Sequence, residues 1–478
     1  MEIEELKKLL SKPSELVAKV QAKEVDLKSD VAYKEYEPET HKVMLAAHRP
    51  DKKVWKPTGV LKADGTPELA QGTEYVNRIP LALQKLIVGR AASFTATPVE
   101  LLAKTETTEQ ETLLAMEEKT WEDNKLNYKT RTIAKCMMSE KECVELWNME
   151  EAEPGYWGSL GNPQSILRMR VTILKPSEGN TFYPVFNNFG NMTAFGRGYK
   201  IKTEGKETEH LDLYTADFTY QFVSQDSGWV LEKQETNIFG KIPIIYYYQP
   251  RSEWADVEWA IERLEKLLSN FADTNDYFAS PKVKVKGKVT GFASKGESGQ
   301  IFELTDGAEM DYLTWNQAPE AIKLEIETLF DIIYTVTQTP NITFKEMKGV
   351  GNLSGIAIKL MFMDAHGKAK DKQDDYFGEC IQRRVNLIKA GMAKVNITLQ
   401  AATNLTITPK FELFMPENEL EQLEIDGKKI ENLSASLPGT DLIDLETAVM
   451  EHPYVKEPKT VLKNVKEEQA QKRVTLTI

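Results

Sequence analysis

The chain is poor in the residues that build metal sites and disulfides. Its 478 residues include three cysteines and five histidines. The cysteines Cys136, Cys143 and Cys380 fit no metal-ligand spacing, and the histidines form no visible cluster. If Cys136 and Cys143 lie on one helix, they stand roughly 10 Å apart, which is too far for a bridge. We therefore predict reduced, buried thiols, and neither a metal ion nor any other cofactor.

Long apolar runs and an excess of positive charge are also missing. No stretch approaches the roughly 18 consecutive apolar residues of a transmembrane helix, so we expect no membrane contact. The charged, amphipathic N-terminus has no apolar signal core. The formal net charge is -13, whereas proteins that grip nucleic acid carry basic surfaces. If the chain handles DNA, it does so through a small local patch or by letting DNA slide past.

The common catalytic motifs are absent as well. The glycine-containing segment 349–355 (GVGNLSG) follows no predicted strand and lacks the dinucleotide-binding spacing. The chain has no P-loop, no Gly-x-Ser-x-Gly elbow and no His-Glu-x-x-His helix. We find no catalytic constellation and predict that the chain is not an enzyme.

The strongest positive signal is a long heptad seam from Trp254 to Phe278. Its spacing of 3-4-3-4-3-4-3 predicts a long helix, and a shorter seam from 322 to 336 predicts a second one. A strand-and-turn segment separates the two. Because the first seam is longer than one neighbouring helix would cover, we expect it to pack in a ring or bundle of subunits. The seam residues are Trp254, Val257, Ile261, Leu264, Leu268, Phe271, Asn275 and Phe278, then Ile322, Ile326, Leu329, Ile333 and Val336.

The rest of the chain is predicted to be a mixture of helices and antiparallel strands. We expect two short helices in 3–27, broken near Pro13 with Ser11 as the cap of the second, and loops with short strands in 36–68. After position 150, alternating Val, Tyr, Phe and Thr residues predict an antiparallel meander that closes at 237–248. The other predicted elements are a helix in 76–91, two helices in 109–150, one long helix from 354 with weak points at Gly367, Gly378 and Gly391, a strand after 404, and helices near 419–432, 441–451 and 458–472.

Between the two seams, lysines alternate with valines. A strand here would be basic on one face and apolar on the other. It is either an edge strand that its lysines protect from aggregation, or a surface for DNA or an acidic partner. The four lysines are Lys282, Lys284, Lys286 and Lys288.

The order of these elements resembles the portal proteins of tailed bacteriophages, the head-to-tail connectors. The resemblance covers roughly residues 75–478. It is carried by NRIPLALQKLIVGRAASFTATPVEL, LYTADFTYQFV with NIFGKIPIIYY, the helix ending SNFADTNDYFASP, TQTPN, LSGIAIKLMFMDAHGKA, and the tail FELFMPENELEQ with VMEHPYVKEPKTVL. Each motif is weak alone, but their order and intervals are specific.

The resemblance implies an α+β portal-type subunit with an α/β wing, a two-helix stem, a small α/β clip and a mostly helical C-terminal crown. Such subunits form a ring, usually a dodecamer, whose channel passes genome DNA. The implied divisions are 1–252 wing, 253–279 stem helix, 280–318 clip, 319–338 second stem helix, 339–354 tunnel loop, 355–404 long wing helix and 405–478 crown.

The resemblance also implies roles for particular residues. The seam residues Trp254, Val257, Ile261, Leu264, Leu268, Phe271, Ile326, Leu329 and Ile333 would form the subunit interface, and the four lysines would bind clip partners. The tunnel loop would face DNA, although on the residues alone it could be an ordinary helix connection. Its candidate residues are Thr343, Phe344, Lys345, Lys348 and Asn352.

The implied partners are other copies of the chain, double-stranded DNA bound without sequence specificity, the terminase large subunit, a head–tail adaptor, and the major capsid and scaffolding proteins. The implied location is the capsid vertex of the virion, after assembly in the host cytoplasm. Two alternatives stay open: a monomeric nucleic-acid-processing enzyme with an unrecognised site, and an unrelated ring-forming scaffold.

Overall fold

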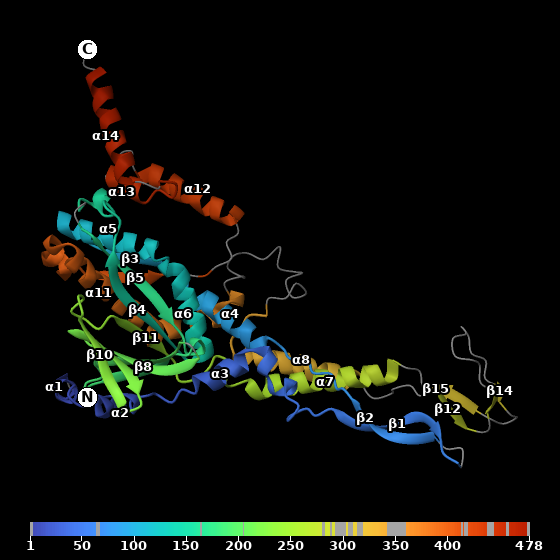
Figure 1. The fold of residues 1–478 in the computed structure, drawn as a ribbon. Coiled ribbons are helices and arrows are strands. Elements are labelled where there is room, and N and C mark those ends of the chain that lie inside the picture. The colour runs from blue at the N-terminus through green and yellow to red at the C-terminus, as the bar shows by residue number, and fades with distance from the viewer. Residues whose placement is uncertain are drawn as a thin grey trace. The chain divides into compact units, whose positions relative to one another are not determined.

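The computed structural model describes residues 3–63, 67–162, 165–203, 205–279, 283–286, 289–291, 303–304, 309–312, 319–341, 360–412, 414, 419–436, 444–455 and 458–475. The chain forms two compact units (Figure 1). The first comprises Met1–Asn341 and Asp364–Leu413, and the second comprises Ile342–Met363 and Phe414–Ile478. The mixture of helices and sheets confirms the predicted α+β class.

Three short helices open the first unit: α1 (Ile3–Leu9), α2 (Pro13–Gln21) and α3 (Ser29–Tyr36). The predicted break near Pro13 is confirmed, because this proline occupies the first turn of α2. The predicted cap is wrong. The capping position falls on Lys12, and the Ser11 hydroxyl instead donates to the Lys8 carbonyl at 3.2 Å.

A long hairpin follows where loops with short strands were predicted. Strand β1 (Lys52–Leu61) pairs antiparallel with β2 (Pro67–Glu74). Prolines and glycines weaken the sequence signal for strands, but an edge strand with a bulge accommodates both. The register indeed shifts between Pro57 and Leu61. The next helix, α4 (Leu83–Thr95), begins later than predicted.

The segment 109–150 contains two helices and then a strand. Helices α5 (Thr108–Asp123) and α6 (Leu126–Glu140) are followed by β4 (Glu142–Glu151). Lys141 turns the chain with a φ of 68°. The two nearer cysteines therefore lie on different elements, so the estimate of their separation along one helix was wrong.

Antiparallel strands build the centre of the first unit. Strands β6 to β10 form the predicted antiparallel meander, but its predicted closure at 237–248 is wrong. Strand β11 instead pairs with β4, which lies between β5 and β11 in a second sheet. In the meander, Leu211 pairs with Phe222 and Leu213 with Tyr220, and these buried side chains pack with those of α1 and α2. The strands are β5 (Leu167–Leu174), β6 (Thr181–Phe186), β7 (Met192–Thr203), β8 (Lys206–Tyr214), β9 (Phe218–Gln225), β10 (Gly228–Thr236) and β11 (Ile244–Tyr248).

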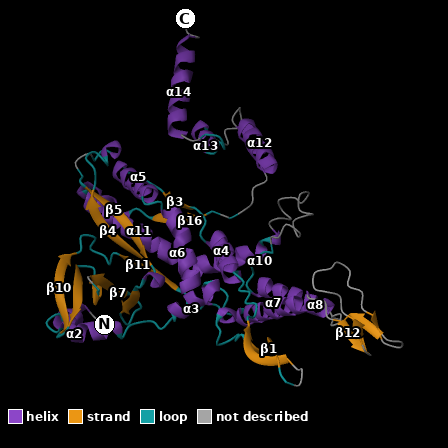
Figure 2. Cartoon of the chain, turned by 45° about the vertical axis from the view of Figure 1, so that its right-hand side comes forward, coloured by secondary structure: helices purple, strands orange, loops and turns teal. Residues whose placement is uncertain are grey.

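The two seam helices are α7 (Glu258–Ala279) and α8 (Pro319–Val336). They lie side by side (Figure 2). Between them the described strands pair as two small ladders, β12 (Val283–Lys286) with β15 (Glu309–Tyr312) and β13 (Val289–Gly291) with β14 (Glu303–Leu304). The predicted order of helix, β excursion and helix is confirmed.

The predicted long helix after 354 is in pieces. Its described part contains α10 (Met363–Lys372), a π-helical turn (Gln373–Phe377) and α11 (Gly378–Val395). The weak point at Gly378 is confirmed, since a side chain there would collide with the Gln373 carbonyl in the widened turn. A 3₁₀ segment (Ile397–Asn404) then follows.

The predicted strand after 404 is β16 (Ile407–Phe411), and it pairs with β3 (Val99–Ala103). It therefore belongs to the first unit, and the division placed at 405 is wrong because the second unit resumes only at Phe414. The described residues from 419 on form three helices, as predicted: α12 (Glu419–Ser436), α13 (Leu445–Met450) and α14 (Pro458–Thr475).

Candidate assembly and channel elements

Helix α7 buries its apolar seam within its own subunit. Trp254, Val257, Ile261 and Leu264 are at most 1% exposed. They belong to the main core, together with Leu329 and Ile333 of α8 and buried residues of α4, α6 and α11. Burying each large aliphatic side chain stabilises the fold by about 1.5–3 kcal/mol. The seam is thus first a folding element of the subunit.

This burial corrects the assignment of the seam to a subunit interface. A side chain that is already covered by its own chain has no surface left for a neighbour. Leu268, Phe271 and Ile326 are half-buried, so they are the only assigned seam residues that retain surface. The heptad spacing predicted the seam correctly, but it could not show that other helices of the same subunit would cover it.

A second, polar face of α7 holds an extended N-terminal segment, here called the strap (residues 41–81). Along α7, side chains of the acidic face bond to the strap at successive turns. The Lys42 amine lies 3.4 Å from Glu258 and 2.5 Å from Glu262. Arg49 donates to Asp273 at 2.8 Å and to Asn270 at 2.7 Å. The strap therefore covers a face that the heptad pattern left unexplained.

Two buried side chains, His41 and Glu265, hold the two ends of the strap together. His41 Nδ1 lies 2.6 Å from a Glu265 carboxylate oxygen, and His41 Nε2 lies 2.8 Å from the Glu35 carbonyl. The same Glu265 oxygen accepts the Leu81 amide at 2.8 Å. Both side chains are almost fully buried, and a buried charge is tolerated only when it is paired and hydrogen-bonded. Sequence reasoning missed this clasp, because its members lie more than 180 residues apart.

The lysine stripe meets carboxylates across its ladder. Lys284 pairs in register with Asp311, and Lys286 pairs with Glu309. The Lys286 amine and the Glu309 carboxylate are 3.5 Å apart, and both side chains are almost 80% exposed. An exposed pair of this kind contributes at most about 1 kcal/mol. Lys282 and Lys288 lie outside the described residues.

The predicted tunnel-loop residues Thr343, Phe344, Lys345, Lys348 and Asn352 lie outside the described residues. The segment just before them is firmly held. The Arg90 guanidinium bonds to the Pro340 carbonyl, and it stands 5.9 Å from the centre of the Tyr334 ring. The Lys368 amine donates to the Thr337 carbonyl at 2.6 Å. These cations satisfy carbonyls at and just after the end of α8, where positive charge is favourable.

A buried carboxylate ties this region to the start of α7. Glu253 pairs with Lys368 and, at 2.8 Å, with Lys372. Burial alone would raise the pKa of Glu253, but the two ammonium groups outweigh it and the pKa is lowered. The end of α8 and the beginning of α7 are therefore joined through α10.

Comparison with known families decides what these elements belong to. A family model described as "Phage portal protein, SPP1 Gp6-like" matches residues 30–474. The chain belongs to this portal protein family. The family is a structural one, and its members are components of the virion. The resemblance inferred from the order of motifs is thereby confirmed.

Other comparisons add little about this portal protein. No curated protein matches it. One matching solved chain comes from "Virion of native gene transfer agent (GTA) particle". It has 12% identity and a TM-score of 0.34, and the match covers 76% of this chain and 86% of that chain. A similarity this weak supports no functional conclusion.

One polar cluster inside the portal subunit superficially resembles an active site. Arg384 Nε donates to both carboxylate oxygens of Glu145, at 2.9 and 3.2 Å, and its other nitrogens bond to Thr130 and Tyr247. Burial, and then Glu145, raise the pKa of the Tyr247 hydroxyl, although Arg384 opposes the shift. Arg384 and Glu145 are fully buried, so no substrate reaches them. The cluster joins α11, β4, β11 and α6.

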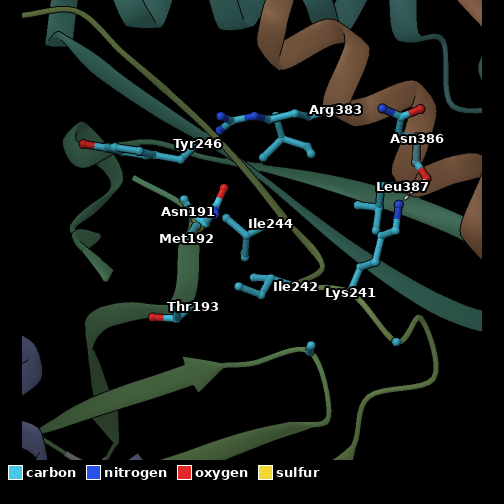
Figure 3. Close-up of a pocket in the computed structure, with 13 residues that line it drawn as sticks. Asn191, Met192, Thr193, Lys241, Ile242, Ile244, Tyr246, Arg383, Asn386 and Leu387 are labelled. Carbon is cyan, nitrogen blue, oxygen red and sulfur yellow. Dashed lines mark hydrogen bonds between the residues drawn. The ribbon is translucent and has the colours of Figure 1, made fainter. Parts of the chain in front are cut away.

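An open pocket of about 480 Å³ lies between the two sheets' loops and α11 (Figure 3). Apolar side chains, among them Ile242 and Ile244, line it together with Lys241 and Arg383. Neither a carboxylate nor a thiol is among its lining residues. Among the described residues, no helix is long and apolar enough to cross a membrane.

Proposed function

We propose that this portal protein forms a ring at one capsid vertex, and that genome DNA enters and leaves through the central channel of the ring. The observation that carries the proposal is the family match over almost the whole chain. The paired helices α7 and α8 around a small β region agree with it. The family's usual number of subunits, twelve, is the number we expect.

Each part of the subunit has a proposed place in the ring. The helix pair is the stem, and the β region at 280–318 is the clip, which docks the terminase large subunit and later a head–tail adaptor. The remainder of the first unit is the wing, which meets the major capsid and scaffolding proteins. The second unit contributes the crown, from Phe414 on, and the tunnel loop.

The proposed contact with DNA is the tunnel loop. It follows α8, whose end is held by Arg90 and Lys368, so the loop starts from a fixed point. Lys345 and Lys348 would form a collar of weak contacts to phosphate around the ring. Such contacts are independent of sequence and sensitive to salt, which suits DNA that must slide.

The state of assembly tests the proposal first. The subunit has a mass of 54.3 kDa, so a dodecamer weighs roughly 650 kDa, and cyclic assembly gives one closed species. We expect native mass spectrometry to show that species and images along the axis to show a central channel. A monomer at micromolar concentration would contradict the ring and favour the alternative of a monomeric enzyme.

The DNA contact has its own test. Deleting residues 344–350 should leave the ring mass unchanged while particles retain shorter genomes or leak DNA. A matched deletion of similar length in the hairpin tip, residues 62–66, controls for shortening a loop. Full-length genomes held stably by the 344–350 deletion would show that this loop is not the DNA-facing constriction.

A further inference from the structure

Helix α7 carries a third stripe, which faces away from the core and meets the strap only at its last residue, Asn270. Trp259, Arg263, Lys266 and Asn270 follow each other at spacings of 4, 3 and 4 residues, which place them on one face. All four are exposed, and the Trp259 side chain is 57% exposed. Large exposed aromatic residues are typical of binding surfaces. The stripe is aromatic and basic.

Helix α8 carries a matching stripe of opposite charge. Glu320, Leu324, Glu327 and Asp331 also follow at 4, 3 and 4 residues, on the side of α8 opposite Leu329 and Ile333. All four are exposed, and Leu324 is 65% exposed. Exposed Lys323 lies beside the stripe, so this face has one apolar side chain, three carboxylates and one lysine, and it remains acidic overall.

Little of either stripe is used within the subunit, although Asn270 accepts a hydrogen bond from Arg49 of the strap. The other two faces of α7 are occupied by the core and by the strap. Arg263 has an ion pair, at 2.6 Å, with Glu325 on the flank of α8. Within the described part of the chain, Lys266, Glu327 and Asp331 have no ion-pair partner. A basic stripe and an acidic stripe of equal period therefore stand on opposite helices of one pair.

We propose that the α7 stripe of one copy packs against the α8 stripe of a second copy. This inference rests on the proposed ring and names the surface that closes it. The occupant is another copy because the two stripes complement each other in charge and in spacing. The contact is heterologous, which generates a ring when its rotation closes. Pairing α7 with α7 would instead place Arg263 and Lys266 against their own copies.

Symmetry also gives the register of the contact. The Arg263–Glu325 ion pair shows which residues of α7 and α8 stand level. Since the helices are antiparallel, Lys266 stands level with the turn between Glu320 and Leu324. A rotation about an axis along the helices preserves these levels, so Lys266 meets Glu320 of the neighbouring copy. Trp259 then meets the turn between Glu327 and Asp331.

A reciprocal charge exchange tests the contact. We would measure ring mass for Lys266→Glu, for Glu320→Lys and for the double variant, with circular dichroism and thermal unfolding to confirm folded subunits. Like charges across an interface weaken association, and 1.4 kcal/mol is tenfold, so each single variant should need about tenfold or more protein to form rings. The double variant should recover ring formation. Lys202→Glu, an exposed lysine on β7, is the matched control.

The outcomes separate this inference from the proposed function. If the unaltered protein forms no ring, the proposed function fails. If rings form and both single variants assemble normally, or if the double variant stays monomeric while folded, the contact is wrong although the ring stands. Rings of normal mass that lose DNA affinity on Lys266→Glu would assign the α7 stripe to DNA and overturn the inference.

Discussion

The inner and outer stripes of the helix pair have the same spacing and opposite environments. Leu264 and Ile333 are buried by their own subunit, whereas Trp259 and Leu324 are more than half exposed. The heptad rule identifies positions that share a face, but it does not say what covers that face. The difference shows that the seam stabilises the subunit, and it leaves the outer stripes as the surface that we propose for assembly.

The largest effect should come from placing a charge in the buried seam and, for comparison, another in the exposed outer stripe. Leu264→Asp buries an unpaired carboxylate in the core, and this typically costs several kcal/mol. We expect unfolded or aggregated subunits by circular dichroism, not folded monomers. Leu324→Lys is the matched variant on the outer stripe: it places a second positive charge beside Lys266 of the neighbouring copy, and it should give folded subunits that fail to form rings. If Leu264→Asp instead gave a folded monomer, the seam would be a contact between subunits and not part of the subunit core.

The buried carboxyl of Glu117 provides a second test of how the subunit interior contributes to stability. Glu117 of α5 is fully buried, and neither carboxylate oxygen has a hydrogen-bond partner among the described residues. Burial raises its pKa to about 8, although Lys389 opposes the shift and Glu118 adds to it slightly. The folded subunit therefore holds a proton on Glu117 between about pH 4.5 and pH 8, where the unfolded chain has lost it.

This raised pKa fixes the sign of a pH dependence. The free energy of unfolding should fall as pH rises from about 4.5 to 8, because ionising the buried carboxyl disfavours the fold. Glu117→Gln removes the ionisation and should stabilise the subunit by up to about 4 kcal/mol above pH 8, with little change near pH 4.5. Denaturant titration at both pH values checks this. Glu118→Gln is the exposed control, and an equal gain from it would contradict the explanation.

The strap should show an intermediate effect, because its bonds are only partly buried. Asp273→Asn removes the acceptor for Arg49 and for the Asn77 amide, and we expect a cost of about 1–3 kcal/mol. Burial raises the pKa of Asp273, but the Asn77 amide and Arg49 outweigh it and the pKa is lowered. The stabilisation is therefore present at neutral pH and is lost as pH falls through the lowered pKa. Proteolysis of the strap at neutral pH and at a pH below the lowered pKa of Asp273 would measure this, and equal protection of the wild-type and Asp273→Asn proteins at neutral pH would refute it.

The smallest effect on stability is expected at the ladder of β12 and β15, in the proposed clip. Changing Lys284 and Lys286 to Gln removes two charges, and loss of the exposed Lys286 charge usually changes stability by less than about 0.5 kcal/mol. We expect intact rings that recruit the terminase or an adaptor poorly, measured by co-sedimentation at physiological salt. Unchanged recruitment would mean that these lysines only protect an edge strand from aggregation.

The sequence by itself determined the elements whose signals are local. The heptad spacing predicted α7 and α8, the alternation predicted the meander, and Pro13 marked the start of α2. The order of motifs also predicted the portal family. These predictions succeed because periodicity and turn chemistry depend on neighbouring residues.

Only the tertiary structure decided what each surface touches. Strand β4 replaced part of a predicted helix because it pairs with β5 and β11 on both sides. The His41–Glu265 clasp and the burial of Leu264 join residues that are far apart in the chain. Burial and ion pairing depend on such distant partners, which periodicity does not encode. The choice between a core face and an assembly face was therefore made by the fold.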